Sequence, residues 1–548
     1  MKKERGITLI ALVITIIVLL ILAGVSIAML TGNNGILTQA QNASEQTEVG
    51  AEKEAISLAY IGATANKEGN GAVTDTDMDD QFGLNGTKAD AEGTSPIIVT
   101  FDESNRQYMI DENGNITGPY EQQEIVQPSG TDGILTQEDM KNGVIEIKWL
   151  TGTTDYASDK PNAPVIKTDL PEGTTMKLVH YDASGNPVDG TDYNYDENKW
   201  ANAEVDINGV KSYFVWIPRY AYKIIYFKDS TSKNEYLNGK ITEEQAKKEE
   251  KIVGYSDSRG IVDKDGQKVD GVESTATTNV GDYFRVHPAF TNDSENNYEN
   301  GGWKEELLGI WVGKYESSLV NKENSSNIVT DDGTTGNILL SDTKHNGKAI
   351  AVQPGMSSWR YCTIGNMYTN AKAYSTDLNS HMLKNSEWGA VAYLTESKYG
   401  RNGEEVTIND NSSHITADAG ISENPEQSST GNETGIYDLS GGAYEYVPAY
   451  YNGSGSLSNG SSFANGTSDE FSTAYTETSA SSAYKPGDAT YETSGWHGDD
   501  AYFVFSSYPF FIRGGDYSNG SGAGVFRFGS SNGNAYNYDS FRMCLAVK

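Results

Sequence analysis

The hydrophobic pattern of the chain begins with one long apolar run. Residues Ile7–Leu30 are 24 consecutive uncharged, mostly apolar positions, enough at about 1.5 Å per helical residue to cross a hydrocarbon layer of roughly 30 Å. The basic leader Met1–Gly6 should stay on the cytoplasmic side. We therefore predict a membrane helix, with the rest of the chain outside the cytoplasm. A signal peptide is the alternative, but its apolar run would be about 7–15 residues long.

The next hundred residues alternate between helical, irregular and strand-like patterns. Gln39–Ala65 continues as helix, whereas Asn66–Gly93 has little apolar periodicity and several Gly and Asp, which predicts loop. Ile97–Phe101 and Tyr108–Ile110 predict a β-hairpin that ends in the turn Glu112–Asn115. This pattern indicates a small β head.

Aromatic strands separated by long polar loops make up the remainder. Strands are predicted at Val144–Leu150, Thr175–Tyr181, Tyr213–Pro218 and Leu308–Tyr315, and helices at Met367–Leu378 and Ser386–Tyr399, the latter with Ser386 as N-cap. Glu243–Lys251 is predicted to be a solvated helix or charged loop. Few strands, two helices and much irregular chain predict an α+β class.

Five parts follow from these patterns. We predict a leader peptide over residues 1–6, a long membrane-spanning helix over 7–65, a small β head over 66–126, a linker with a β segment over 127–204, and a loop-rich α+β domain over 205–548.

Charge and cysteine content narrow the function. The 548 residues hold 41 Lys and Arg against 76 Asp and Glu, a net charge of -35, which excludes nucleic acid as a partner because phosphate contacts need a basic face. Only two cysteines, Cys362 and Cys544, are present, so a multi-cysteine metal site is excluded. We interpret them as two buried small hydrophobes, and a disulfide between them outside the cytoplasm stays open.

The first residues carry a resemblance. Lys2-Lys3-Glu4-Arg5-Gly6-Ile7-Thr8-Leu9-Ile10 resembles the start of type IV prepilins and pseudopilins. The resemblance implies cleavage between Gly6 and Ile7 by a prepilin peptidase, other pilins as partners, and a cell-surface location, membrane-anchored or pilus-associated. The family usually has a glutamate five residues into the mature chain, where this chain has Ala11. That departure favours a minor or tip subunit, or an anchored surface protein, over a major fibre subunit.

Five motifs in order carry a second resemblance. They are Trp359-Arg360-Tyr361-Cys362, Asn385-Ser386-Glu387-Trp388-Gly389-Ala390, the run Gly435–Val447, Phe511-Ile512-Arg513-Gly514-Gly515-Asp516-Tyr517, and Ser540-Phe541-Arg542. In this order they resemble the formylglycine-generating-enzyme-like branch of the C-type lectin fold, over roughly 205–548. Arg513 and Arg542 are expected to be structural, because a desolvated guanidinium in an aromatic strand needs a carboxylate such as Asp438 or Glu445.

Catalytic signatures do not accompany this resemblance. The formylglycine-generating enzymes bind copper through two cysteines after the Arg-Gly-Gly motif, and no cysteine lies between Gly514 and Phe541. The six histidines are scattered, and no phosphate loop is present. Asp263–Gly266 with Asp270 has carboxylates at calcium-loop spacing, but Ser274 stands where the closing Glu belongs. We predict no enzyme and no cofactor, with calcium at this loop as the alternative.

The segment Asp516–Asp539 has the composition of a binding loop. Tyr, Ser, Gly, Asn and Asp dominate it, and antibody loops use these residues because Tyr gives contact area at low entropy cost. Its position resembles that of the variable segment in diversity-generating retroelement proteins. The resemblance implies these ligand-binding positions: Asp516, Tyr517, Ser518, Arg527, Gly529, Ser530, Ser531, Asn534, Tyr536, Asn537, Tyr538 and Asp539. It implies this fixed frame: Arg513, Gly514, Gly515, Val525, Phe526, Phe541 and Arg542. A merely solvated turn is the alternative.

The predicted function is therefore binding. We predict a cell-surface, pilin-like adhesin or receptor that grips an external protein or glycan without turnover, on a C-type lectin scaffold. The alternatives are a structural pilus or pseudopilus subunit and an oxidoreductase of the formylglycine-generating type.

Overall fold

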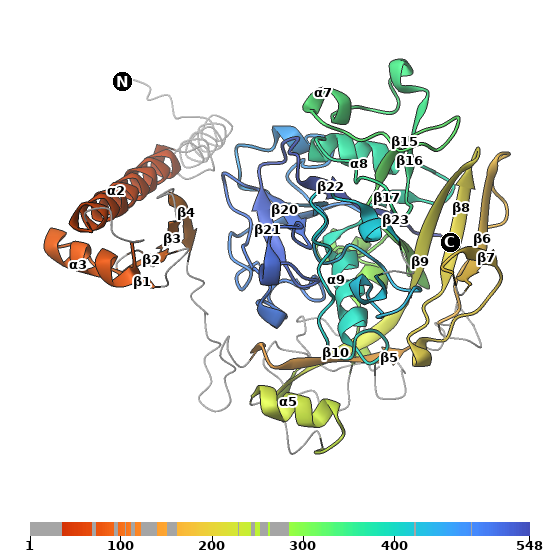
Figure 1. Ribbon diagram of the computed structural model, residues 1–548, viewed down its shortest axis with the longest axis horizontal. Coiled ribbons are helices and arrows are strands. Elements are labelled where there is room, and N and C mark those ends of the chain that lie inside the picture. The colour runs from red at the N-terminus through yellow and green to blue at the C-terminus, as the bar shows by residue number, and fades with distance from the viewer. Residues whose placement is uncertain are drawn as a thin grey trace, which may run out of the picture. The chain divides into compact units, whose positions relative to one another are not determined.

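A computed structural model describes most of the chain. It covers residues 36–67, 73–92, 97–102, 104, 106–110, 116–121, 140–150, 162–182, 184–227, 229–242, 247–251, 261–262, 284–420, 424–483 and 485–547. The chain divides into two compact units, Met1–Glu124 and Ile125–Lys548, which are described separately below (Figure 1).

The predicted fold class is corrected by the helices of the structure. Among the described residues no helix is both long and apolar enough to cross a membrane, so a fold that begins with a long membrane helix is wrong as a description of this structure. The predicted span Ile7–Leu30, the cleavage junction Gly6–Ile7 and Ala11 lie outside the described residues. The long helix that is described, α2 (Ile36–Asn66), confirms the helix predicted over Gln39–Ala65, but it carries several charged residues.

The first unit packs two helices against one antiparallel sheet (Figure 1). The sheet runs in the order β1 (Ala89–Glu92), β2 (Ile97–Phe101), β3 (Arg106–Ile110) and β4 (Ile116–Glu121). The core holds Ile56 of α2 with Phe82, Val99 and Tyr108. Pairing of β2 with β3 confirms the predicted strands, while the turn Glu112–Asn115 lies outside the described residues.

Helix α3 (Asp75–Asn85) and β1 lie where the sequence predicted loop. Capping explains the helix, because Thr74 and Asp77 cap each other's backbone N–H in a capping box. Met78 and Phe82 then face the core at helical spacing. Two apolar positions in a polar helix gave too weak a periodicity to be recognised from the sequence.

A seven-stranded sheet forms one layer of the second unit (Figure 1). Its order is β17 (Ser380–Met382), β23 (Met543–Leu545), β14 (Gly309–Gly313), β9 (Val210–Pro218), β8 (Asn202–Ile207), β6 (Thr174–Tyr181) and β7 (Pro187–Asp189). The last strand of the chain thus lies next to strands from the middle of the sequence. Because Thr174–Val179 of β6 pair with β8, residues before 205 belong to this unit, and the predicted division at residue 205 does not separate two domains.

Three further sheets are formed by the described residues of this unit. One joins β5 (Gly143–Trp149), β10 (Tyr220–Phe227), β11 (Lys247–Lys251), β13 (Phe284–Val286) and β12 (Ile261–Val262). A second pairs β15 (Ser318–Asn321) with β16 (Lys348–Ala351). The third joins β19 (Thr473–Tyr475), β18 (Tyr444–Tyr451), β20 (Phe510–Arg513), β21 (Phe528–Ser531) and β22 (Asp539–Phe541). The domain therefore has far more strands than predicted, and part of the charged segment Glu243–Lys251 is a strand.

Four α-helices are described in this unit, and one of them is central. They are α5 (Ser230–Leu237), α7 (Gly333–Gly336), α8 (Ile364–Lys372) and α9 (Asn385–Glu396). All twelve residues of α9 are buried, since the helix contacts β5, β9 and β18. Its N-cap is Lys384 and not the predicted Ser386, and the Glu387 side chain bonds back to the Lys384 N–H.

Candidate functional site

The predicted binding segment is held at both ends by one sheet. It begins after β20 and ends in β22, and β18 pairs with both, antiparallel to β20 and parallel to β22. Strand β21 pairs with β20 in the middle of the segment. Two loops therefore leave a common framework: a first loop over residues 514–527 and a second loop over residues 532–538.

A buried ion pair fixes the framework. Arg542 Nε donates to both carboxylate oxygens of Glu445, at 3.1 and 3.0 Å, and Nη2 contacts the same carboxylate. The remaining donors reach the carbonyl oxygens of Gly313 at 2.9 Å and Asp438 at 3.2 Å. Arg542 is 0% exposed, and the pairing predicted for it is confirmed. Burial raises the pKa of Glu445 to about 7, although the Arg542 guanidinium acts in the opposite direction.

The Arg513–Gly515 corner needs its two glycines. Gly514 and Gly515 have φ of +78° and +86°, and a Cβ on Gly515 would lie 2.7 Å from the Cβ of Ala523. The Arg513 guanidinium lies over the Trp388 ring, 5.5 Å from its centroid, and donates to the Ala489 carbonyl at 3.0 Å. The carboxylate pairing predicted for Arg513 is therefore wrong; an aromatic face and a carbonyl hold it instead.

Tyrosine rings line the second loop. Tyr536 and Tyr538 are stacked, with centroids 5.1 Å apart. Tyr444 meets Tyr538 edge-on at 5.7 Å, and the Arg527 guanidinium lies over the Tyr444 ring, 4.6 Å from its centroid. Because Tyr444 N–H also donates to the Tyr538 carbonyl at 2.8 Å, ring contact and backbone pairing fix the same two residues.

Two residues of the loop that follows β16 also hold the backbone of the second loop. Tyr361 N–H donates to the Tyr536 carbonyl at 2.8 Å, and the Arg360 guanidinium donates to the Asn537 carbonyl. Tyr361 and Tyr444 had been interpreted only as parts of fold motifs. Sequence reasoning missed them as site residues because they lie 90 to 180 positions before the second loop, and aromatic residues inside those motifs were the one available signal.

The first loop contributes one more ring. Asp516 Oδ1 accepts from the Ser518 N–H at 3.0 Å and from its hydroxyl at 2.8 Å, an Asx turn that fixes Tyr517 between them. The Tyr517 ring meets the His414 ring edge-on, 5.0 Å between centroids. Burial lowers the pKa of His414 to about 4, with the Arg360 charge acting in the same direction. At neutral pH a neutral imidazole therefore supports this tyrosine.

The structure separates the twelve predicted binding residues into two classes. Those at least partly exposed are Tyr517, Ser518, Ser530, Asn534, Tyr536, Asn537 and Tyr538. Those that are buried are Asp516, Arg527, Gly529, Ser531 and Asp539. The buried five cannot act as free contact residues, which corrects their prediction. Gly529, Ser531 and Asp539 lie in paired strands, where a composition of small polar residues gave no sign of burial.

We call the five partly exposed rings Tyr361, Tyr444, Tyr517, Tyr536 and Tyr538 the tyrosine surface. Beneath it lies the Asp539 carboxyl, fully buried. Burial raises the pKa of Asp539 to about 8. The chemistry offered outward is thus aromatic faces, phenol hydroxyls and the polar groups of Ser518, Asn534 and Asn537. Such groups suit recognition of another surface, since tyrosine combines a large apolar area with a hydrogen-bonding tip.

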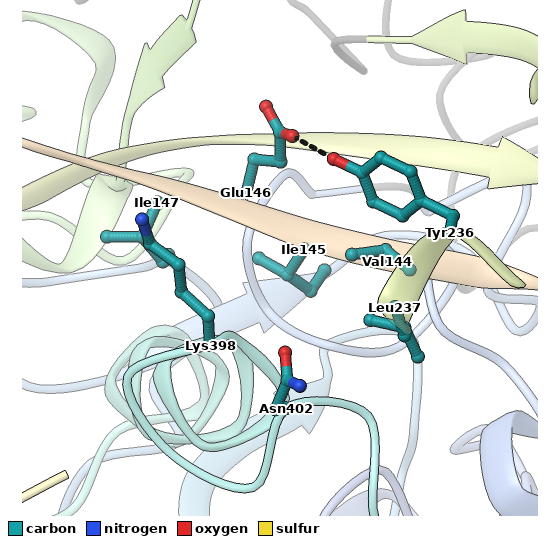
Figure 2. A pocket seen from close by; sticks show the side chains of 8 residues that line it. All are labelled: Val144, Ile145, Glu146, Ile147, Tyr236, Leu237, Lys398 and Asn402. Carbon is teal, nitrogen blue, oxygen red and sulfur yellow. Dashed lines mark hydrogen bonds between the residues drawn. The ribbon is translucent and has the colours of Figure 1, made fainter. Parts of the chain in front are cut away.

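A separate cavity of about 350 Å³ lies elsewhere in this unit (Figure 2). Four consecutive residues of β5, Val144–Ile147, line one side, with Tyr236 and Leu237 of α5 and with Lys398 and Asn402 after α9. Tyr236 donates to the Glu146 carboxylate at 2.8 Å. None of the predicted site residues lines this cavity.

The two cysteines are both free and buried, as their interpretation as small buried residues predicted, and they are not joined by a disulfide. The candidate calcium loop Asp263–Gly266 and Asp270 lies outside the described residues. Comparison with protein-family models and with curated proteins finds no match to this chain.

Proposed function

We propose that this chain is a non-catalytic recognition protein that binds an external protein or glycan through its tyrosine surface. The observation that carries the proposal is the Tyr536–Tyr538 stack, partly exposed and fixed at its backbone by Tyr361 and Tyr444. The resemblance of the first residues to prepilins adds display at the cell surface to the proposal.

Pre-organisation is the physical argument for binding. The second loop is held by backbone hydrogen bonds from Tyr361 and Tyr444, and Asn532 donates to the Tyr536 hydroxyl at 2.9 Å. A ligand therefore meets rings that are already ordered, so little conformational entropy is lost on binding. Stacked tyrosines present broad faces to sugars or to apolar and cationic side chains, and tyrosine is enriched at binding hot spots.

The exposed polar residues of the two loops also support a binding function. Asn534 and Asn537, both in the second loop, are exposed, and their amides can donate and accept hydrogen bonds. The first loop adds Ser518 beside Tyr517. Aromatic faces rimmed by adaptable polar groups are the composition of antibody paratopes.

The test uses labelled full-length chain on two probes, an array of immobilised glycans and a displayed library of random peptides. Probes that bind the unaltered chain are then measured against the double variant Tyr536→Ala, Tyr538→Ala. Loss of two hot-spot tyrosines should weaken binding at least about 10-fold. The control is Tyr193→Ala, because Tyr193 is also partly buried but packs on Tyr195. Unchanged affinity of the double variant for every bound probe, with an unchanged melting temperature, would contradict the proposal.

A further inference from the structure

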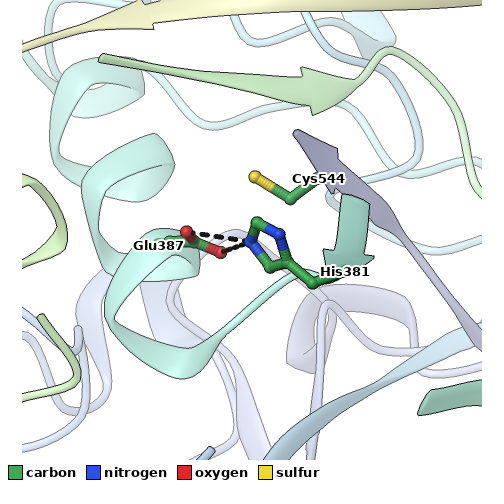
Figure 3. Close-up of side chains that lie close together, drawn as sticks. All are labelled: His381, Glu387 and Cys544. Atoms are coloured by element: carbon green, nitrogen blue, oxygen red, sulfur yellow. Dashed lines mark hydrogen bonds and ion pairs between the residues drawn. The ribbon is translucent and has the colours of Figure 1, made fainter. Parts of the chain in front are cut away.

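A buried cluster of three metal-ligand side chains lies apart from the tyrosine surface. His381 is on β17, Glu387 is in the first turn of α9, and Cys544 is on β23. His381 and Cys544 are direct partners in the pairing of β17 with β23, so both side chains leave the sheet on the same face. Figure 3 shows Glu387 reaching the imidazole from the helix, with the sulfur above the ring.

The three donor atoms converge at ligand spacing. His381 Nε2 lies 3.1 and 3.0 Å from the two carboxylate oxygens of Glu387, and one donor atom from each of the three residues lies within 4.8 Å of the others. All three side chains are 0% exposed. Tetrahedral zinc, with nitrogen and oxygen at about 2.0–2.2 Å and sulfur at about 2.3 Å, holds its ligand atoms about 3.3–3.6 Å apart, which lies between the 3.0 Å contact and the 4.8 Å limit of this cluster.

Hydrogen bonds orient the donors toward one point. His381 Nδ1 lies 2.8 Å from the Asn379 carbonyl oxygen, which can only accept, so Nδ1 carries a proton and Nε2 is the ring nitrogen left to bind a metal. Glu387 in turn accepts the Lys384 N–H at 2.9 Å. Outer hydrogen bonds that fix the tautomer and the carboxylate are typical of metal sites.

A ring nitrogen and a carboxylate oxygen at this distance need a proton or a metal cation between them. Cys544 adds a sulfur donor to the same cluster, and zinc is a cation that takes nitrogen, oxygen and sulfur ligands together.

We propose that His381, Glu387 and Cys544 bind one zinc ion, which ties α9 to the β17–β23 edge of the large sheet. On binding, the Cys544 S–H bond breaks, its sulfur forms a bond to zinc, and the proton leaves to solvent. The thiolate and the carboxylate then balance the charge of the ion, and neutral His381 completes the protein ligands. A nitrogen, oxygen and sulfur donor set favours zinc over calcium or magnesium, which take oxygen ligands. This proposal does not depend on the proposed binding function.

The test grows the full-length chain in minimal medium supplied with Zn²⁺ or with Co²⁺. After purification the zinc sample should hold about one metal ion per chain by elemental analysis. The cobalt sample should show a sulfur-to-cobalt charge-transfer absorption. Cys544→Ser should lose that absorption, whereas the matched variant Cys362→Ser should keep it, because Cys362 is equally buried but is not in the cluster.

Two results would overturn the proposal. One is a folded unaltered chain that carries only trace metal from either medium, a measurement that does not depend on any variant folding. The other is a charge-transfer absorption that persists in Cys544→Ser, which would place the metal on another sulfur. Loss of the absorption in Cys362→Ser, with retention in Cys544→Ser, would contradict it in the same way.

Discussion

Tyr536 and Tyr538 stack their rings with 5.1 Å between centroids and 11° between ring planes. The residue between them, Asn537, is exposed, and its carbonyl accepts from Arg360. The two tyrosine rings therefore lie nearly parallel, and the backbone of the residue between them is held by the hydrogen bond from Arg360. Tyr444 extends the group because it meets Tyr538 edge-on.

Tyr444 supports this group by its ring more than by its hydroxyl. For a probe that binds the tyrosine surface, Tyr444→Ala should weaken the affinity about 10-fold, because the Tyr538 ring loses the ring that packs against it. Tyr444→Phe keeps the ring and loses only the hydroxyl, 3.3 Å from Arg527 Nη2, so its affinity should stay within about 3-fold of the unaltered chain. The measurement is a titration by surface plasmon resonance. Equal losses for the two variants would show that the hydroxyl carries the effect.

The Arg542–Glu445 pair should dominate the stability of the framework. Arg542→Met leaves the Glu445 carboxylate buried without its partner, and such a change costs about 3–5 kcal/mol of the free energy of unfolding. The double variant Arg542→Met, Glu445→Met should lose clearly less than the sum of the two single variants. Denaturant unfolding of all four proteins gives the coupling energy. A coupling near zero would mean that the pair does not act as a unit.

The sequence could predict those elements whose signal is local. Residues Gln39–Ala65, Ile97–Phe101 and Tyr213–Pro218 lie in a helix and two strands as expected, because periodicity within a few residues indicates each of them. Arg542 was expected to pair with a carboxylate for an equally local reason, the cost of a guanidinium in an aromatic strand.

What the sequence could not show depends on contacts between distant residues. Strands of three or four residues, such as β17 and β23, have no readable alternation. Asp539 belongs to a polar, loop-like stretch, yet the parallel pairing of β22 with β18 buries it completely. His381 and Cys544 are 163 positions apart and become neighbours only through strand register, so the zinc cluster had no signature in the spacing of the sequence.

Gly389, the glycine of the central helix α9, is expected to be hard to replace. A Cβ at this position would lie 1.8 Å from the Gly487 carbonyl oxygen, whereas at Gly347 it would meet nothing within 4 Å. Backbone cannot move aside cheaply, so Gly389→Ala should destabilise the chain by roughly 3 kcal/mol or more. Gly347→Ala should stay within about 0.5 kcal/mol of the unaltered chain. Thermal unfolding followed by circular dichroism compares them, and similar melting temperatures would show that α9 and the Gly487 backbone can move apart.

Asp539 should make the stability of the chain fall as the pH rises. Burial raises its pKa from 3.8 to about 8 in the folded chain, with the negative charge of Asp516 acting in the same direction. The folded state therefore holds the proton more tightly than the unfolded state. The contribution of this proton to the free energy of unfolding is complete below about pH 4. It declines by about 1.4 kcal/mol per pH unit between the unfolded-state and folded-state pKa values, and it is lost above pH 8.

The variant Asp539→Asn isolates this contribution, because its amide has nearly the shape of the protonated carboxyl and does not titrate. In denaturant unfolding at several pH values from 5 to 9, the free energy of unfolding of Asp539→Asn should rise relative to that of the unaltered chain as the pH rises. The difference should be largest near pH 9. Other buried acids, such as Glu445, change both proteins alike and cancel in the difference. A difference that does not vary with pH would mean that Asp539 titrates near its ordinary pKa, and therefore that solvent reaches the carboxyl beneath the tyrosine surface.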